Sequence, residues 1–350
     1  MKARLEKSHL IIALSGILLL AGCLAAPGFE GPSMNNFDGT HFKNRTAIQR
    51  GPADMARLSF EALSEMSDWP EWVDTSMGSV PNSSKGIVVT FVNHATLLLQ
   101  IGDVTVLTDP VYAERASPFS FAGPKRVHAP GIPLTELPDV DVILISHNHY
   151  DHLDLETLKA IRDQQVNRGS KPPLVLAGLG NGALLDSEGI ENNIEMNWRD
   201  QQELFGLGFH FTECRHRSGR GIFDQNKTLW GSFVIESRLG NIYFAGDTGY
   251  DQQFNEAAEQ FGEFALALLP IGAYEPRWFM AEIHLNPAEA VQAHLDLNAR
   301  QSIGMHYGTF QLTFEAVDRP VKDLRVALKE AGLADEEFWA FEPGQSRRVK

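Results

Sequence analysis

Short apolar runs separated by turn-forming residues dominate the chain from about residue 86 onwards. Runs of apolar and β-branched residues of this length are typical of strands. They cover residues 87–91, 96–101, 104–108, 142–145, 209–212, 242–245 and 302–305. Gly102-Asp103 separates the second run from the third, which favours a tight hairpin turn. A domain built largely from strands is therefore expected to begin near residue 85.

Helix-start signals lie between some of these runs. Asp154 precedes a helical pattern that reaches Arg168 and stops at Gly169, and its carboxylate can cap the first turn. Asn286-Pro287-Ala288-Glu289 combines a capping residue, a proline and an acidic residue in the order that starts a helix. Residues 53–72 are also helical in part. These two caps predict helices directly after the candidate site motifs.

The N-terminus has the pattern of a secretory signal. Basic residues precede an apolar run over residues 10–20, which is short for a membrane span. Leu20-Ala21-Gly22-Cys23 then resembles a bacterial lipobox, so Cys23 is the expected lipidation site and membrane anchor. Leu24 after this cysteine indicates the outer membrane of a Gram-negative cell envelope. An ordinary signal peptide with a chance cysteine is the alternative.

These patterns divide the chain into three parts. Residues 1–22 are expected to be a lipoprotein signal peptide, and residues 85–350 a catalytic domain. Residues 23–84 are expected to form an extension that is either a tether or a segment lying on the domain surface, because residues 25–50 are rich in Gly, Pro, Asn and Ser. After cleavage only Cys214 would accompany Cys23, which excludes an internal disulfide.

Composition and charge narrow the function classes. The chain has 350 residues, 43% of them hydrophobic, and a formal net charge of -15. This charge argues against a nucleic-acid partner, whose phosphates would be repelled. An anionic substrate remains compatible with it, because two divalent cations can dominate the field at a reaction centre.

The segment His147-Asn148-His149-Tyr150-Asp151-His152 carries the clearest chemistry, since four of its six residues are potential metal ligands. It directly follows the apolar run 142–145, so a strand end would present these ligands from a rigid edge. The spacing suits two metal ions rather than one. The alternative is a polar turn with surface histidines.

Three distant residues complete a plausible ligand set. His216, Asp247 and His306 each follow a strand-like run. Asp247 lies between glycines in Gly246-Asp247-Thr248-Gly249, where a tight turn would let its carboxylate bridge two ions. His216 alone is also compatible with a solvated basic loop, and Asp247 and His306 with structural roles. The remaining histidines that we expect to be structural or exposed are His9, His41, His94, His128, His210 and His294.

The order of these motifs resembles the metallo-β-lactamase superfamily. Within it, the match narrows to the N-acyl-phosphatidylethanolamine-hydrolysing phospholipase D group. The segments that carry this resemblance are Leu144-Ile-Ser-His-Asn-His-Tyr-Asp-His-Leu-Asp154, Trp230-Gly-Ser-Phe, Phe244-Ala-Gly-Asp-Thr-Gly-Tyr250 and Leu269-Pro-Ile-Gly-Ala-Tyr-Glu-Pro-Arg-Trp-Phe-Met280. The resemblance covers roughly residues 85–320 and implies an α/β (α+β) fold, the four-layer αββα sandwich.

The resemblance also implies roles for single residues. One zinc would be held by His147, His149 and His216, the other by Asp151, His152 and His306, with Asp247 and a hydroxide shared between them. Asp109 would support the site from behind the ligands, and His284 would lie near the substrate phosphate. The residues expected to be catalytic are thus Asp151, Asp247 and His284. Tyr274, Arg277 and Trp278 are a candidate substrate wall, although aromatics are also ordinary core residues.

The implied function is a dinuclear zinc phosphodiesterase of the phospholipase D type, cleaving N-acyl-phosphatidylethanolamine to phosphatidic acid and N-acylethanolamine. Iron or manganese can occupy similar ligand sets. The expected partners are a phospholipid substrate and a membrane, with the oligomeric state open between monomer and homodimer. The alternatives are hydrolysis of another ester, a lactone, a soluble phosphodiester or a β-lactam, and an envelope lipoprotein with a purely structural metal site.

Overall fold

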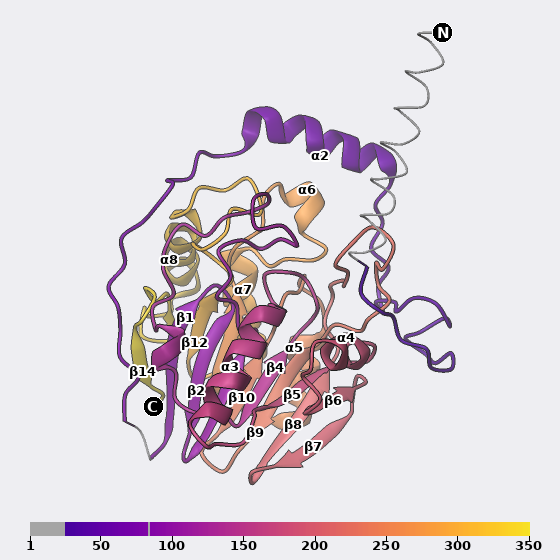
Figure 1. The fold of residues 1–350 in the computed structure, drawn as a ribbon. Coiled ribbons are helices and arrows are strands. Elements are labelled where there is room, and N and C mark those ends of the chain that lie inside the picture. The colour runs from indigo at the N-terminus through magenta and orange to yellow at the C-terminus, as the bar shows by residue number, and fades with distance from the viewer. Residues whose placement is uncertain (1–24, 83–84) are drawn as a thin grey trace.

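The computed structural model describes residues 25–82 and 85–350. Two seven-stranded sheets lie face to face, and helices cover their outer faces (Figure 1). This arrangement of helix, sheet, sheet and helix confirms the αββα sandwich expected from the resemblance. Among the described residues, no helix combines the length and apolar character that crossing a membrane requires.

The first sheet has the strand order β14-β1-β2-β3-β4-β5-β6. Neighbouring strands are antiparallel from β14 to β3 and parallel from β3 to β6. The strands of this sheet are β1 (Ile87–Asn93), β2 (Thr96–Ile101), β3 (Val104–Thr108), β4 (Val142–Ile145), β5 (Leu174–Gly178), β6 (Asn193–Met196) and β14 (Ser346–Arg348).

The second sheet repeats this plan in the order β7-β8-β9-β10-β11-β12-β13. Its strands are antiparallel from β7 to β10 and parallel from β10 to β13. They are β7 (Gln201–Leu204), β8 (Leu207–Thr212), β9 (Ser232–Glu236), β10 (Asn241–Phe244), β11 (Phe264–Pro270), β12 (Ser302–Met305) and β13 (Phe338–Trp339). The two sheets therefore have matching topologies, although no sequence repeat is evident.

The helices cover the outer faces of the sheets, apart from α2 and α6, which lie at the top of Figure 1. Trp278 Nε1 of α6 donates to Glu61 of α2 at 2.8 Å, which joins these two helices. The described helices are α2 (Pro52–Glu65), η1 (Leu134–Glu136), α3 (Leu155–Asn167), α4 (Gly182–Ser187), α5 (Gln253–Phe261), α6 (Arg277–Met280), α7 (Pro287–Asp296) and α8 (Arg319–Ala331).

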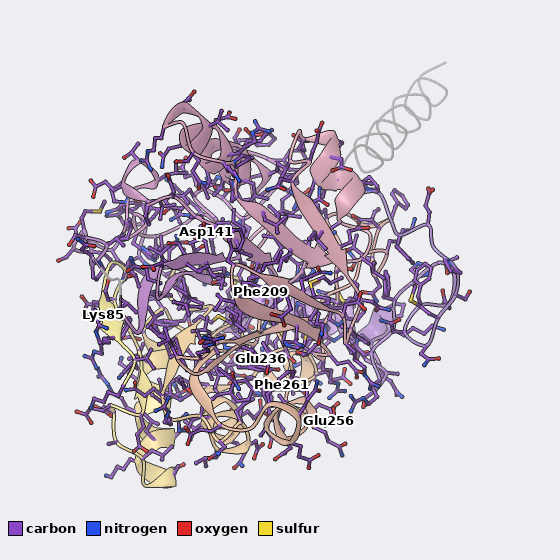
Figure 2. All side chains as sticks on the ribbon, turned by 90° about the horizontal axis from the view of Figure 1, so that it is seen from below. Lys85, Asp141, Phe209, Glu236, Glu256 and Phe261 are labelled. Atoms are coloured by element: carbon purple, nitrogen blue, oxygen red, sulfur yellow. The ribbon has the colours of Figure 1, made fainter. Side chains whose placement is uncertain are left out.

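Successive side chains of β4 point to opposite faces of the sheet, so this one strand contributes to two apolar clusters. Val142 and Leu144 point into the cluster between the sheets, whereas Ile143 and Ile145 pack in the outer cluster that contains Leu158 of α3. Each such side chain contributes about 1.5–3 kcal/mol when it is fully buried. Figure 2 shows which labelled side chains lie inside the molecule and which lie at its edge. Phe209 lies in the interior, while Lys85 and Glu256 lie at the periphery.

Both predicted helix caps are confirmed. The Asp154 side chain accepts a hydrogen bond from Thr157 N at the start of α3. Asn286 and Glu289 form a reciprocal capping box at the start of α7. The predicted strands are also present, with ends shifted by up to two residues. Helix α2 ends at Glu65, short of the limit at residue 72 that the sequence suggested.

Residues 28–50 of the extension pack against the domain and do not form a free tether. Phe37 and Phe42 are each 1% exposed and belong to the main apolar core. Phe42 N donates to Asn226 O at 2.7 Å, which fixes the segment to the loop before β9. The signal peptide and Cys23 lie outside the described residues and stay predictions. Cys214 is buried and forms no disulfide within the described residues.

Candidate metal centre

The candidate ligands lie in loops that follow strands at one edge of the sandwich. Because β3 and β4 are parallel, the loops after them emerge side by side, and Asp109 and His147 begin those loops. In the second sheet, β10 and β12 both run parallel to β11, and Asp247 and His306 follow them. His216 follows β8. The seven predicted ligands are thereby brought together.

The first group consists of His147, His149 and His216, whose ligand atoms all lie within 4.8 Å of one another. His147 Nε2 is 2.7 Å from His149 Nδ1. His216 Nδ1 lies 3.0 Å from the Ile283 carbonyl oxygen, which leaves Nε2 for the group. Burial and then nearby imidazoles lower the pKa of His147, and burial and then Arg217 lower that of His149 to about 4. Both rings are neutral near pH 7, as metal ligation requires.

The second group contains Asp151, His152 and His306, joined by His94. Asp151 Oδ2 lies 3.3 Å from His306 Nε2 and 3.4 Å from His152 Nε2. Burial by itself lowers the pKa of His306, but the charge of Asp247 and the hydrogen bonds to Asp151 and Asp247 together outweigh burial and raise that pKa to about 9. The carboxylates of Asp151 and Asp247 therefore favour a positive charge between them.

Asp247 lies between the two groups. Its Oδ2 is 3.1 Å from His306 Nε2 and 3.2 Å from His152 Nε2 in the second group. It is also 3.7 Å from His216 Nε2 in the first. Gly246 precedes it with φ +58°, and a Cβ at Gly246 would come within 2.5 Å of Ser146 Cβ. Only glycine allows the turn that brings this carboxylate between both groups.

The donor atoms fit metal ions. Six buried side-chain atoms of this centre have no hydrogen-bond partner among the described residues, although buried polar atoms are normally bonded. These atoms are His94 Nδ1, His152 Nε2, His216 Nε2, Asp247 Oδ1, His284 Nδ1 and His306 Nδ1. Imidazole nitrogens with carboxylate oxygens are the ligand set of catalytic zinc and of related divalent metals. The centre therefore has two adjoining His/Asp groups of metal-binding composition.

Asp109 lies behind the second group and orients His152. Its Oδ2 is 2.6 Å from His152 Nδ1, and it accepts hydrogen bonds from the backbone and hydroxyl of Ser146 at 2.8 and 2.6 Å. This contact directs His152 Nε2 towards Asp151 and Asp247. Such an outer partner fixes the tautomer of a metal-ligating histidine.

His94 is the residue that sequence reasoning missed. We expected it to be structural, yet its Nε2 lies 3.1 Å from Asp151 Oδ2, within the second group. The predicted strand stopped at residue 91, whereas β1 continues to Asn93. His94 thus directly follows a strand, as His306 does, and the other predicted ligands also lie just beyond strand ends, so that position is the available signal. Of the other histidines, those described but outside the metal groups are His41, His128, His210 and His294, while His9 lies outside the described residues.

A cavity of about 350 Å³ opens over the centre. Its polar part is formed by residues of both groups, by His284, whose Nδ1 is 3.9 Å from Asp247 Oδ2, and by Tyr150, Arg217, Glu275 and Thr313. Burial lowers the pKa of His284 to about 3, so its imidazole is neutral. Apolar side chains form the rest of the wall, namely Leu58 of α2 with Phe279, Met280, Ile283, Leu312 and Phe314.

The three residues expected to form a substrate wall lie outside this cavity lining. Tyr274 Oη donates to Asp323 at 2.8 Å, and Arg277 forms an ion pair with Glu289 at 2.8 Å. Trp278 donates to α2, as described above. Their polar ends are satisfied by other elements, so the wall is formed instead by the neighbouring residues Phe279 and Met280.

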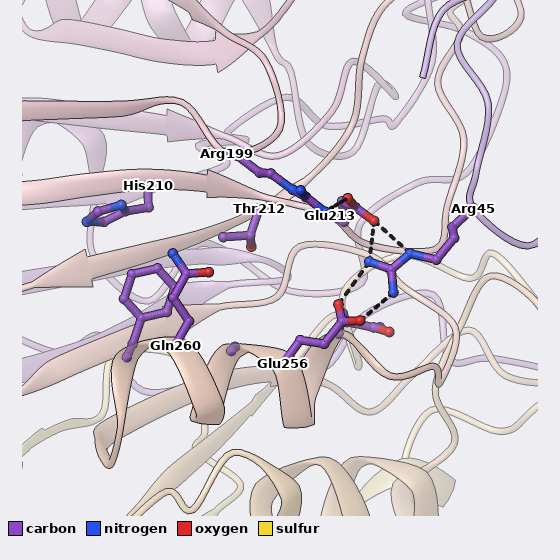
Figure 3. A pocket seen from close by; sticks show the side chains of 10 residues that line it. Arg45, Arg199, His210, Thr212, Glu213, Glu256 and Gln260 are labelled. Atoms are coloured by element: carbon purple, nitrogen blue, oxygen red, sulfur yellow. Dashed lines mark hydrogen bonds and ion pairs between the residues drawn. The ribbon is translucent and has the colours of Figure 1, made fainter. Parts of the chain in front are cut away.

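A second hollow of about 270 Å³ lies between α5 and the loop after β8 (Figure 3). Arg45 lies at one end of this hollow, between Glu256 and Glu213, and forms ion pairs with them at 2.6 Å and 2.5 Å. His210 faces this hollow but belongs to none of the metal groups found among the described residues. Glu213 is three positions before His216, so Arg45 fixes the extension to the ligand-bearing loop.

Comparison with known proteins agrees with the fold and with the motifs of the metal centre. A family model described as the beta-lactamase superfamily domain matches residues 104–307. The N-acyl-phosphatidylethanolamine-hydrolyzing phospholipase D 1 of Caenorhabditis elegans is 40% identical over 236 residues, covering 66% of this chain and 66% of that protein. The mitochondrial protein of similar name from Saccharomyces cerevisiae is 36% identical over 66% of this chain and 49% of its own length. The chain thus spans at most about two thirds of these relatives.

A solved structure agrees on the fold. The metallo-beta-lactamase fold protein YhfI from Bacillus subtilis superimposes with a TM-score of 0.53 at 15% identity, covering 75% of this chain and all of that one. Since the family model covers more than half of the chain, the chain belongs to the metallo-β-lactamase superfamily, within which it is similar to the N-acyl-phosphatidylethanolamine-hydrolysing phospholipases D.

Proposed function

We propose that this protein is a metal-dependent phosphodiesterase of the phospholipase D type, which cleaves N-acyl-phosphatidylethanolamine to phosphatidic acid and an N-acylethanolamine. The observation that carries the proposal is the position of Asp247, whose Oδ2 lies within 4.0 Å of histidines from both groups. The named activity of the C. elegans and S. cerevisiae relatives supports the phosphodiester as substrate class.

In this proposal His147, His149 and His216 hold one zinc ion and Asp151, His152 and His306 the other, with Asp247 contributing to both. When bound, such ions act as Lewis acids and lower the pKa of water towards neutrality. Asp109 keeps the Nδ1 proton on His152. Cys214 is buried, which raises the pKa of its thiol, so this cysteine is not suited to act as a nucleophile.

The cavity suits an amphiphilic substrate. Its apolar wall, which includes Leu58, Phe279 and Ile283, can receive acyl chains, while His149, Asp247 and His284 form the polar part. The neutral imidazole of His284 has an unpartnered Nδ1 and can donate a hydrogen bond to a phosphate oxygen from its protonated nitrogen. A soluble substrate would gain less from the apolar wall.

Membrane attachment through Cys23 in an outer membrane remains part of the proposal. Confinement of the enzyme to a bilayer would raise its effective concentration towards a phospholipid. Support for this part comes only from the lipobox pattern in the sequence.

The test is to measure the metal content of the mature protein and its turnover of four substrates side by side. These are an N-acylated phosphatidylethanolamine, unmodified phosphatidylethanolamine, a lactone and a β-lactam. We expect about two equivalents of metal, by the two-group ligand set, and fastest turnover of the N-acylated lipid. Asp247→Asn should lose more than about 100-fold of this turnover, since a residue contacting both groups matters more than an outer partner. Rapid lactone turnover without lipid turnover would overturn the phospholipase assignment, and full activity of Asp247→Asn would overturn the metal mechanism.

A further inference from the structure

One arginine facing the cavity has no partner among the described residues. Arg217 directly follows His216 and lines the cavity together with His149. Its side chain is half-buried, its Nε is buried without a hydrogen-bond partner, and it forms no ion pair in the described part of the chain. A guanidinium has five N–H donors and remains charged at any ordinary pH.

The neighbouring arginines of the same loop are paired within the protein. Arg215 forms an ion pair with Glu282 at 3.1 Å, although its Nε is also buried without a hydrogen-bond partner. Arg220 donates to the carbonyl oxygens of Asn148 and Leu153 at 3.0 and 2.8 Å, and it lies over the ring of Tyr150. Of these three arginines, Arg217 is therefore the one whose guanidinium has neither an ion pair nor a hydrogen bond among the described residues.

Arg50 places a second cation against Phe279, a residue of the cavity wall, although Arg50 does not itself line the cavity. It donates to the Phe279 carbonyl oxygen and lies 3.8 Å over the Phe279 ring, and its Nε and Nη1 are buried without partners. Burial and then the charge of Arg217 lower the pKa of Arg50 to about 10, so the two guanidiniums lie near enough to repel each other.

A partly buried cation near a site for metal ions is costly unless an anion accompanies it. The charges of Glu282 and Asp54 partly compensate that of Arg50. The chain has a formal net charge of -15, so carboxylates are abundant, yet none is paired with Arg217 among the described residues. The missing anion is therefore expected to arrive with the substrate. Arginine favours planar, bidentate contacts with phosphate and carboxylate oxygens.

We propose that Arg217, with Arg50 beside it, forms a subsite for the charged phosphate oxygen of the substrate next to the first histidine group. This deepens the proposed function, on which it rests, because it makes the negative charge of the phosphodiester a requirement for tight binding. Neutral esters and lactones would lack this contact.

The experiment compares Arg217→Gln, Arg217→Lys and the control Arg238→Gln, each as the full metal-loaded protein. Arg238 is exposed and removing its charge changes net charge equally. One readout is the inhibition constant of inorganic phosphate, and the other is KM for a phosphodiester and for a neutral ester or lactone. Arg217→Gln should weaken phosphate binding and raise the phosphodiester KM by about 10-fold, as expected for loss of a charged hydrogen bond. The KM of the neutral substrate should stay unchanged.

Arg217→Lys should retain part of the phosphate binding, since lysine keeps the positive charge but lacks the planar guanidinium fork. Metal content should equal that of the wild type in every variant. Equal phosphate inhibition of Arg217→Gln and wild type would overturn the subsite, as would loss of metal from Arg217→Gln. If the wild type turned over only neutral substrates, the phospholipase assignment would fall, and the phosphate inhibition constant would still decide the subsite.

Discussion

The side-chain amide of Asn44 forms two hydrogen bonds with the backbone of His216. Asn44 Nδ2 donates to the His216 carbonyl oxygen at 2.7 Å, and Asn44 Oδ1 accepts from the His216 amide at 3.1 Å. Trp230 Nε1 donates to the same Oδ1 at 3.2 Å. Since Ile283 fixes the ring of His216, both ring and backbone of this candidate ligand are held. A residue of the N-terminal extension therefore takes part in positioning the metal centre.

Replacing Asn44 should weaken the first metal group. In Asn44→Ala the His216 backbone loses both contacts, and we expect metal affinity to fall by about 10-fold or more, the range for residues that orient ligands. Asn44→Asp keeps the acceptor for the His216 amide and loses the donor, so its affinity should lie in between. Competition with a coloured chelator measures the affinity for each metal equivalent.

Asn36→Ala provides a matched control in the same segment. Asn36 Nδ2 donates to Asn197 Oδ1 at 2.8 Å, and Asn36 belongs to none of the metal groups. Its metal affinity should match the wild type. An equal loss in both alanine variants would mean that docking of the whole extension matters, and that Asn44 has no particular role.

The second metal group should depend on Asp109. Asp109→Asn preserves the size of the side chain but removes a charged acceptor from His152 Nδ1. We expect the affinity for one metal equivalent to fall by about 10- to 100-fold, while the equivalent held by the first group is retained. Stepwise metal titration separates the two. Asp103→Asn, an exposed change in the hairpin turn, serves as control, and uniform weakening of both equivalents would contradict the assignment of Asp109 to His152.

Much of this site could be predicted because it depends on local patterns. Short apolar runs predict the strands, and residues that directly follow strands meet at one edge of a parallel arrangement. Asp247 and His306 illustrate this, since each follows a strand parallel to β11. His94 was missed for a local reason as well. Strand β1 ends with the polar residue Asn93, so an apolar pattern could not mark its true end.

Contacts between distant segments could not be predicted in this way. Asn44 and His216 are 172 positions apart, and no periodicity connects an isolated polar residue to its partner. The extension lacks a helical or strand pattern, and it is held by the burial of Phe37 and Phe42 and by the ion pairs of Arg45. Sequence patterns also do not reveal the direction of a side chain, as Tyr274 and Arg277 show, because their polar ends bind Asp323 and Glu289 and do not line the cavity.

Metal removal should lower both activity and stability. Without cations, Asp151 and Asp247 are buried carboxylates whose described ion-pair partners are histidines. A metal that binds only the folded chain stabilises it by about 2.7 kcal/mol at a free concentration 100 times its Kd. Chelation should therefore reduce the Tm, and added zinc should restore the Tm and turnover together. An unchanged Tm after verified metal loss would contradict a metal coupled to folding.

Stability should also depend on pH through His294, which is remote from the metal groups. His294 of α7 is 3% exposed, and its Nδ1 is 2.8 Å from Ser302 Oγ of β12. Burial lowers its pKa below the ordinary value of 6.5, an effect partly opposed by the charge of Glu337. The folded state therefore favours the neutral ring. This contribution to stability is present above about pH 6.5 and is lost as the pH falls from there through the folded-state pKa.

The free energy of unfolding should accordingly fall less steeply between pH 7 and pH 5 in His294→Asn than in the wild type. The difference in slope is at most about 1.4 kcal/mol per pH unit, the value for one proton. Denaturant titrations in the presence of a chelator measure it, because the histidines of the metal groups then contribute equally to both proteins. His41→Asn, at an exposed histidine, should follow the wild-type slope. If His294→Asn also followed the wild-type slope, unfolding would not be accompanied by proton uptake at His294. Burial of this ring between α7 and β12 would then not contribute to the pH dependence of the free energy of unfolding.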